Sequence, residues 1–193
     1  MMQGITLSIK RKGWLKSKEL HMPVDFKRRP LPWYTYPAIN FVGKRLRPDM
    51  KVFEFGSGNS TLWYAKMVGE VISVEHNKGF YNKMKPQITH LKNITYIHSS
   101  PKHFAYKIHE YSQKFDVIII DGINRYACLR SATQKLKADG VIILDNTDRP
   151  YKPLIEKLTE LKFKEIEFKG FGPIGSKEWE TSIFYRENNC FGI

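Results

Sequence analysis

Short apolar runs alternate with stretches whose apolar residues recur at helical spacing, from residue 51 to about residue 186. The apolar runs predict strands at 52–55, 71–75, 94–98, 115–121, 141–144, 163–168 and 181–185. The amphipathic stretches predict helices at 61–67, 78–88, 101–111, 125–136 and 153–161. This order predicts an α/β fold: a doubly wound, Rossmann-like, seven-stranded, mostly parallel sheet with helices on both faces.

The first fifty residues lack this alternation. Pro23, Pro30, Pro32 and Pro37 make the stretch 23–37 irregular, because proline has no backbone N–H and a fixed φ. We therefore predict a basic N-terminal cap segment at 1–50 and one domain at 51–193.

A glycine turn follows the first predicted strand. Glu54 ends the apolar run, Gly56 and Gly58 come next, and Glu75 ends the second strand. A strand, a glycine turn, a helix and a second strand ending in an acid are typical of a nucleotide-binding βαβ unit. A dinucleotide site would have a third glycine where this chain has Thr61, and no lysine follows as in a P-loop. An ordinary turn with a solvated glutamate is the plain alternative.

The acid, glycine, small residue and glycine in this turn resemble motif I of the class I S-adenosylmethionine-dependent methyltransferases. In that family the turn lets the backbone approach the methionine part of the cofactor, and the acid of the second strand binds the ribose hydroxyls. The family's last strand runs antiparallel and inserts between the fifth and sixth strands. By this resemblance, the predicted S-adenosylmethionine-binding residues are Glu54, Gly56, Ser57, Gly58, Asn59, Ser60, Glu75, His76, Ser99 and Asp121. Glu54 would accept a hydrogen bond from the cofactor's amino group, or else cap the backbone donors of the turn.

The stretch 31–39, together with the glycine turn and the end of the second strand, is similar to a group of short bacterial methyltransferases. In that group the segment before the first strand folds over the cofactor. The resemblance implies that Trp33, Tyr34, Thr35 and Tyr36 line the cofactor or acceptor pocket, with Thr35 and Tyr36 on the cofactor. Packing of the cap against the sheet is the alternative role.

Two aspartates end neighbouring strands of the predicted sheet. Methyl transfer needs a group that takes the acceptor's proton, and Asp121 and Asp145 are the candidate catalytic residues. With Asn146 they partly resemble the divalent-cation site of the catechol and caffeoyl-CoA O-methyltransferases, in which Mg²⁺ binds the acceptor hydroxyls. The stretch 123–126 does not match that family. A metal-free base at Asp121 or Asp145 is favoured, and a divalent cation stays an alternative.

The net charge of +13 raises the question of an anionic partner. Residues 1–50 carry 11 Lys and Arg against 3 Asp and Glu, which suits nucleic acid, an anionic membrane or a phosphorylated substrate as well as an ordinary solvated surface. The Asn/Asp-Pro-Pro-aromatic motif of base N-methyltransferases is absent after the fourth strand. No apolar run is long enough to span a membrane, and no signal peptide is recognisable, so a cytoplasmic protein is expected.

Together these features predict an S-adenosylmethionine-dependent methyltransferase that acts on a hydroxyl of a small-molecule or glycosyl acceptor. An RNA methyltransferase is the second hypothesis, motivated by the basic N-terminal segment. A non-catalytic cofactor-binding or partner-binding domain of the same fold is the third. The oligomeric state stays open.

Overall fold

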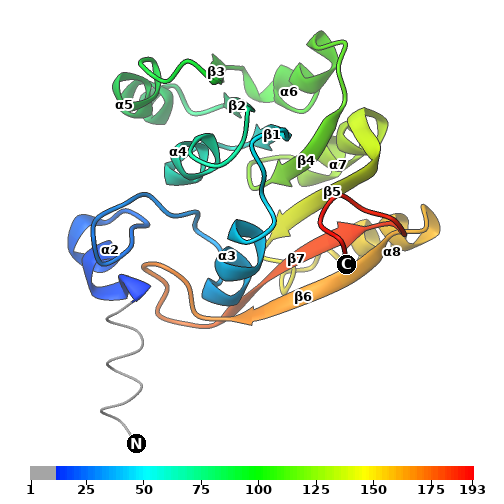
Figure 1. The fold of residues 1–193 in the computed structure, drawn as a ribbon. Coiled ribbons are helices and arrows are strands. Elements are labelled where there is room, and N and C mark those ends of the chain that lie inside the picture. Colours follow the sequence, from blue (N-terminus) through cyan, green and yellow to red (C-terminus); the bar gives the residue numbers. More distant parts are fainter. Residues whose placement is uncertain (1–11) are drawn as a thin grey trace, which may run out of the picture.

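A computed structural model describes residues 12–193 of the chain. Its centre is a seven-stranded sheet in the order β3-β2-β1-β4-β5-β7-β6 (Figure 1). The strands are β1 (Lys51–Phe55), β2 (Glu70–Glu75), β3 (Ile94–His98), β4 (Phe115–Ile120), β5 (Leu136–Asp145), β6 (Lys164–Gly170) and β7 (Trp179–Tyr185). β1 to β5 pair in parallel, whereas β7 runs antiparallel to both β5 and β6. The predicted fold is confirmed, including the insertion of the last strand between the fifth and sixth.

Helices cover both faces of this sheet. They are α2 (Trp14–Leu20), α3 (Tyr36–Gly43), α4 (Asn59–Ala65), α5 (Lys78–Ile88), α6 (Pro101–Phe104), the 3₁₀ turn η1 (Lys107–Glu110), α7 (Arg125–Lys135) and α8 (Lys152–Glu160). α6, η1, α7 and α8 pack on one face, and α3 and α4 pack on the other. α5 packs through Met84 and Ile88 against α4 and β3. The layers follow from the strand pattern, in which alternate side chains such as Val52 and Phe53 enter opposite cores.

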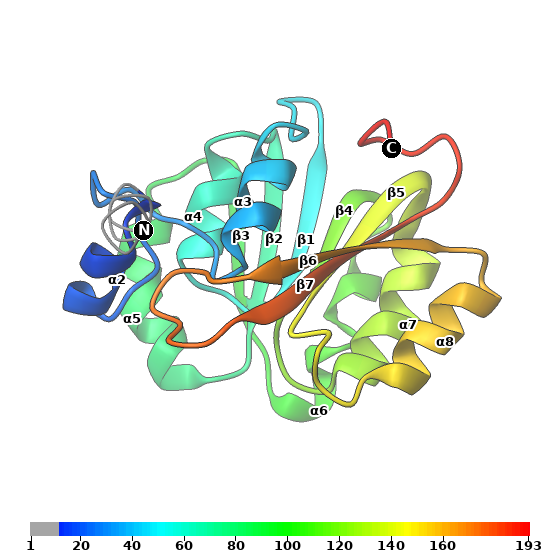
Figure 2. The same cartoon turned by 90° about the horizontal axis from the view of Figure 1, so that it is seen from below.

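Residues 12–37 connect two distant parts of the molecule. The Trp14 indole donates to the Gly175 carbonyl (2.7 Å) in the loop between β6 and β7, and Figure 2 shows that loop reaching toward α2. The Asn59 amide at the start of α4 donates to the Pro23 carbonyl (2.7 Å). This segment therefore spans from the glycine turn to the β6–β7 loop. Its division from residues 51–193 as a cap stays a prediction.

Three elements differ from the sequence predictions. The predicted helix at 101–111 is divided into α6 and the 3₁₀ turn η1. The helix predicted at 61–67 begins earlier, at Asn59, with Gly58 in the N-cap position. The strand predicted at 141–144 begins at Leu136, and its pairing with β4 shifts register. A Cβ on Gly140 would lie 2.7 Å from Leu136 Cγ, so a glycine is needed at this close approach.

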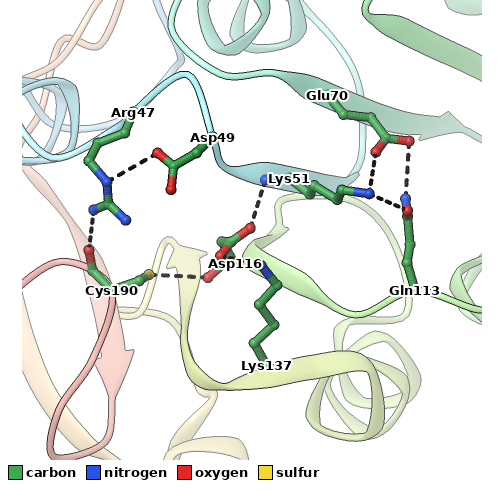
Figure 3. Close-up of polar contacts among 8 residues, drawn as sticks. All are labelled: Arg47, Asp49, Lys51, Glu70, Gln113, Asp116, Lys137 and Cys190. Atoms are coloured by element: carbon green, nitrogen blue, oxygen red, sulfur yellow. Dashed lines mark hydrogen bonds and ion pairs between the residues drawn. The ribbon is translucent and has the colours of Figure 1, made fainter.

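A polar network holds the end of the sheet at which the parallel strands begin (Figure 3). The buried Asp116 carboxylate accepts from the Lys51 backbone N–H (2.8 Å) and from Lys137 Nζ (2.7 Å). Arg47 donates to the Cys190 carbonyl (2.7 Å), which ties the C-terminal loop to the same edge. These contacts stabilise the end of the sheet where the parallel strands begin. Ligands of such sheets bind at the other end, beyond the carboxyl ends of the strands.

Candidate functional site

The glycine turn brings β1 close to the end of β4. Gly56 has φ +95°, and a Cβ built on it would lie 2.6 Å from the Asp121 backbone oxygen, so only glycine fits. Gly58 is open: the nearest atom to its built Cβ is Ser60 Oγ at 3.8 Å. The turn thus places Asp121 directly beside a stretch of backbone that a ligand can approach closely.

Glu54 lies beneath this turn and is almost fully buried. Its carboxylate accepts from the hydroxyls of Ser60 (2.5 Å), Thr61 (2.5 Å) and Ser73 (2.7 Å). Burial raises the pKa of Glu54 to about 7, although these three hydroxyl donors oppose the rise. The structure therefore joins Glu54 to side-chain hydroxyls of α4 and β2 rather than to the backbone donors of the turn. Contact with the cofactor's amino group stays a prediction.

Glu75, at the end of β2, fits a ribose-binding role. Its carboxylate accepts from the Asn77 backbone N–H (2.7 Å), the Ser57 backbone N–H (3.1 Å) and the Ser57 hydroxyl (2.9 Å). The Ser57 hydroxyl also lies 2.8 Å from the Tyr96 hydroxyl. A hydroxyl already donates to this carboxylate, so a ribose hydroxyl can take the same place if Ser57 turns to Tyr96. The carboxylate oxygens of Glu75 are therefore suitable acceptors for the ribose hydroxyls of S-adenosylmethionine.

His76 and Ser99 lie next to Glu75. The His76 ring packs edge-on against Phe104 with centroids 5.6 Å apart, and its Nδ1 lies 3.1 Å from Glu75 Oε1. The buried Ser99 donates its backbone N–H to the Glu75 carbonyl (2.9 Å). The structure brings both residues beside Glu75, and their contact with adenine stays a prediction.

Asp121 and Asp145 lie at the ends of neighbouring strands and are bridged by Arg125. Its guanidinium donates to Asp121 Oδ1 (3.0 Å), to the Asp145 backbone oxygen and, more weakly, to Asn146 Oδ1 (3.4 Å). Arg125 also donates through Nε to the Gly122 carbonyl (3.2 Å). Arg125 therefore holds the ends of β4 and β5 together.

The two aspartates differ in their partners. Burial and the negative charge of Asp121 raise the pKa of Asp145, whose Oδ1 has only the neutral donors Trp179 (3.1 Å) and Thr181 (2.6 Å). Burial also raises the pKa of Asp121, but Arg125 and Arg149 oppose that rise. At neutral pH Asp121 is therefore the more ionised of the two carboxyl groups, and Asp145 is the more protonated.

Residues from β7 and the cap complete the surroundings of Asp145. Thr181 accepts at Oγ1 from the Thr35 backbone N–H (3.2 Å) while donating to Asp145. Thr35 Oγ1 donates to the Phe168 carbonyl (2.9 Å), so its side chain is already used to hold the cap on β6. Tyr36 is nearly buried, and its hydroxyl has no hydrogen-bond partner within residues 12–193. Cofactor contact of Thr35 and Tyr36 stays a prediction.

A pocket of about 400 Å³ opens beside these aspartates. Its lining comprises Trp33, Asp121, Asp145, Asn146, Asp148, Arg149 and residues 175–179. Trp33 is half exposed and lines this pocket, whereas Tyr34 is fully buried in the core and does not line it. Contact of Trp33 with a cofactor or acceptor stays a prediction. The pocket has the size of a small-molecule site and lies on the β5 side of the glycine turn.

Sequence reasoning missed Trp179 and Thr181 as neighbours of Asp145. The predicted insertion of the last strand beside the fifth was the signal available, because it places the start of β7 against the end of β5.

The described residues also bear on metal binding and on membrane crossing. Within residues 12–193 no cluster of three or more His, Cys, Asp or Glu side chains is placed to hold a metal ion. Over the same range, no helix combines the length and apolarity needed to cross a membrane.

Solved structures with the same architecture include proteins described as methyltransferases. A protein from Streptococcus mutans, described as a methyltransferase in complex with SAH, matches with a TM-score of 0.59 at 14% identity, over 76% of this chain and 94% of that chain. An rRNA methylase from Streptococcus thermophilus matches with a TM-score of 0.61 at 13% identity, over 77% and 93%. A protein from Klebsiella pneumoniae, described as an O-methyltransferase, matches with a TM-score of 0.63 at 18% identity, over 83% and 85%.

No protein-family model and no curated protein matches the sequence. The three structural matches each cover at least 76% of this chain, which has the strand order and the antiparallel insertion of β7 described above. The described part of the chain therefore has the fold of the class I S-adenosylmethionine-dependent methyltransferases.

Proposed function

We propose that this protein is an S-adenosylmethionine-dependent methyltransferase that methylates a hydroxyl of a small-molecule or glycosyl acceptor. The observation that carries the proposal is the position of Asp121. Its backbone contacts the glycine turn, and its carboxylate lines the adjacent pocket. An acceptor in that pocket would lie between a carboxylate and the ligand held at the turn, which is the proximity that a direct transfer needs.

The cofactor would be held by the open backbone at Gly58, by Glu75 and by the neighbouring Ser57. When bound, it supplies a methyl group on a positively charged sulfur: the acceptor oxygen gains the O–CH₃ bond and the S–CH₃ electron pair returns to sulfur. Asp121, the more ionised of the two aspartates, takes the acceptor proton. Asp145, which holds a proton at neutral pH, orients the acceptor hydroxyl through its second oxygen.

Arg125 motivates a prediction about metal dependence. Its guanidinium already bonds Asp121 and Asn146, two of the three residues that a divalent cation would use. We expect methyl transfer from labelled S-adenosylmethionine, screened against catechols, simple glycosides and nucleosides, to survive excess EDTA. Loss of transfer with EDTA and its recovery with Mg²⁺ would show instead that a metal displaces Arg125 and activates the acceptor.

A non-catalytic domain of this fold is the competing proposal. In that case the two aspartates with raised pKa would serve only to pack the strand ends. Detection of transfer to any acceptor, and its loss on replacing Asp121, would decide against it.

A further inference from the structure

One part of the chain has basic residues and no acid. Residues 76–109 contain six lysines and five histidines without a single Asp or Glu, although the whole chain has 19 acidic residues. The segment starts immediately after Glu75, the predicted ribose-binding residue. No acidic residue of the segment therefore offsets its positive charge.

The segment first builds α5 and β3 along one outer edge of the sheet, because β3 is the terminal strand (Figure 1), and then α6 and η1 on the face that α7 covers. Four exposed lysines lie on α5 or in the turn before β3, and none forms an ion pair with an acid of the described chain: Lys78, Lys83, Lys85 and Lys92. We call these four residues the β3 edge surface. Their ammonium groups raise the local potential and attract a polyanion.

An aromatic ring accompanies these lysines. Phe80 on α5 is 37% exposed and is the large apolar side chain that α5 and β3 present to solvent. It is aromatic and not aliphatic. Exposed rings beside lysines suit nucleobases, which stack on aromatic faces, better than a bilayer, which also favours aliphatic side chains.

The positive surface continues toward the acceptor pocket. A hollow of about 370 Å³ lies between α4, α5 and Pro30, and Lys66 and His90 are in its lining. Pro30 pairs with Val24 at the base of a tight hairpin, residues 24–30, whose exposed tip includes Phe26.

Hydrogen bonds to one side chain hold the hairpin in shape. The Asp25 carboxylate accepts from the backbone N–H groups of Lys27 (2.8 Å) and Arg29 (2.9 Å), which fixes the tip and presents Lys27 and Arg28 to solvent. The chain then leads through residues 31 and 32 to Trp33 at the mouth of the acceptor pocket. An elongated polyanion on the β3 edge surface can thus follow basic side chains to the site.

We propose that this surface binds the phosphate backbone of single-stranded RNA and that the methylated hydroxyl is a ribose hydroxyl of that RNA. The second half of the proposal rests on the proposed function, because it keeps the methylation site at Asp121, and it takes the glycosyl acceptor to be a ribose within a polynucleotide in place of a small molecule. The first half does not, because binding needs neither the cofactor nor turnover. The acceptor oxygen loses its proton to Asp121 and gains the methyl group, as for any other hydroxyl acceptor.

The test is fluorescence anisotropy with a labelled single-stranded RNA of about 20 nucleotides, which is longer than one ordinary single-strand site. The wild type should bind with an affinity that falls steeply with salt. The triple variant Lys83→Glu/Lys85→Glu/Lys92→Glu should bind about 100-fold more weakly at 0.1 M salt, and its log K–log salt slope should be smaller by about 2.

A matched control separates this surface from the general positive charge. Lys44, Lys114 and Lys162 are also exposed and without an ion pair among the described residues. They precede β1, β4 and β6, and so lie at the end of the sheet where these strands begin. Lys44→Glu/Lys114→Glu/Lys162→Glu has the same net charge and should bind RNA within about threefold of the wild type, since these lysines contact no phosphate in the proposal. An equal loss in both triple variants, or binding only to anionic vesicles, overturns the proposal.

The acceptor half has its own readout. Methyl label should pass from S-adenosylmethionine to the RNA and not to the same sequence made as DNA, which lacks the 2′-hydroxyl. Label in both, or in neither while RNA still binds, refutes the ribose assignment and leaves the binding surface. Failure to bind S-adenosylhomocysteine refutes the proposed function separately, because RNA binding does not depend on the cofactor.

Discussion

Replacing Asp121 by Asn is expected to lower kcat by about 10²–10⁴-fold, the range that a positioned general base contributes. The side chain keeps its size and its place beside Arg125, so the affinity for S-adenosylhomocysteine should stay within about tenfold of the wild type. The measurement is single-turnover transfer to an accepted substrate, paired with calorimetry. Asp148→Asn is the matched control, because Asp148 lines the same pocket and lies on the loop before α8.

The pH dependence of kcat gives the same prediction a second readout. The pKa of Asp121 is raised by burial, so its base form is lost as pH falls through that raised value, and kcat should fall with it. Arg125→Met removes the cation that opposes the rise, so the acid limb should move to higher pH. An unchanged kcat in Asp121→Asn, or an acid limb that does not move in Arg125→Met, contradicts the assignment of Asp121 as base.

Replacing Gly56 by Ala is expected to lower the free energy of unfolding by about 2–5 kcal/mol, which combines backbone strain at positive φ with overpacking. The new Cβ would meet the Asp121 backbone oxygen at 2.6 Å, and neither strand end can move without breaking the sheet. Urea unfolding gives the measurement. The variant should also lose affinity for S-adenosylhomocysteine, because the turn and the end of β4 must separate.

Gly192→Ala is the control for strain alone. Gly192 also has a positive φ, but no atom lies within 4 Å of its built Cβ. Gly192→Ala should lower the free energy of unfolding by only about 1 kcal/mol. Equal losses for Gly56→Ala and Gly192→Ala would mean that close approach to Asp121 is not what the glycine turn requires.

The elements that sequence predicted well carry strong local signals. The limits of α5 and β3 agree with the predicted ranges, because Asn77 caps the helix through Phe80 N–H and the apolar period is clear. The order of strands also followed from the resemblance, and with it the clustering of Glu75, Asp121 and Asp145 at one edge of the sheet.

Contacts between segments distant in sequence could not be predicted in the same way. Arg125 follows an ordinary helix start, and nothing local indicates that its guanidinium crosses to the end of β5. Thr181 meets Asp145 only because β7 inserts antiparallel beside β5, with a register that the alternating pattern does not set. The irregular start of β5 depends on Gly140 meeting Leu136, which is a matter of packing rather than period.

Calorimetry with S-adenosylhomocysteine tests the central claim most directly, because it asks whether the turn between β1 and α4 grips this ligand. The account predicts a micromolar Kd for the wild type, about −7 to −8 kcal/mol, and at least about tenfold weaker binding for Glu75→Gln, which loses the charge that receives the ribose hydroxyls. No binding by the wild type up to millimolar ligand would contradict the account.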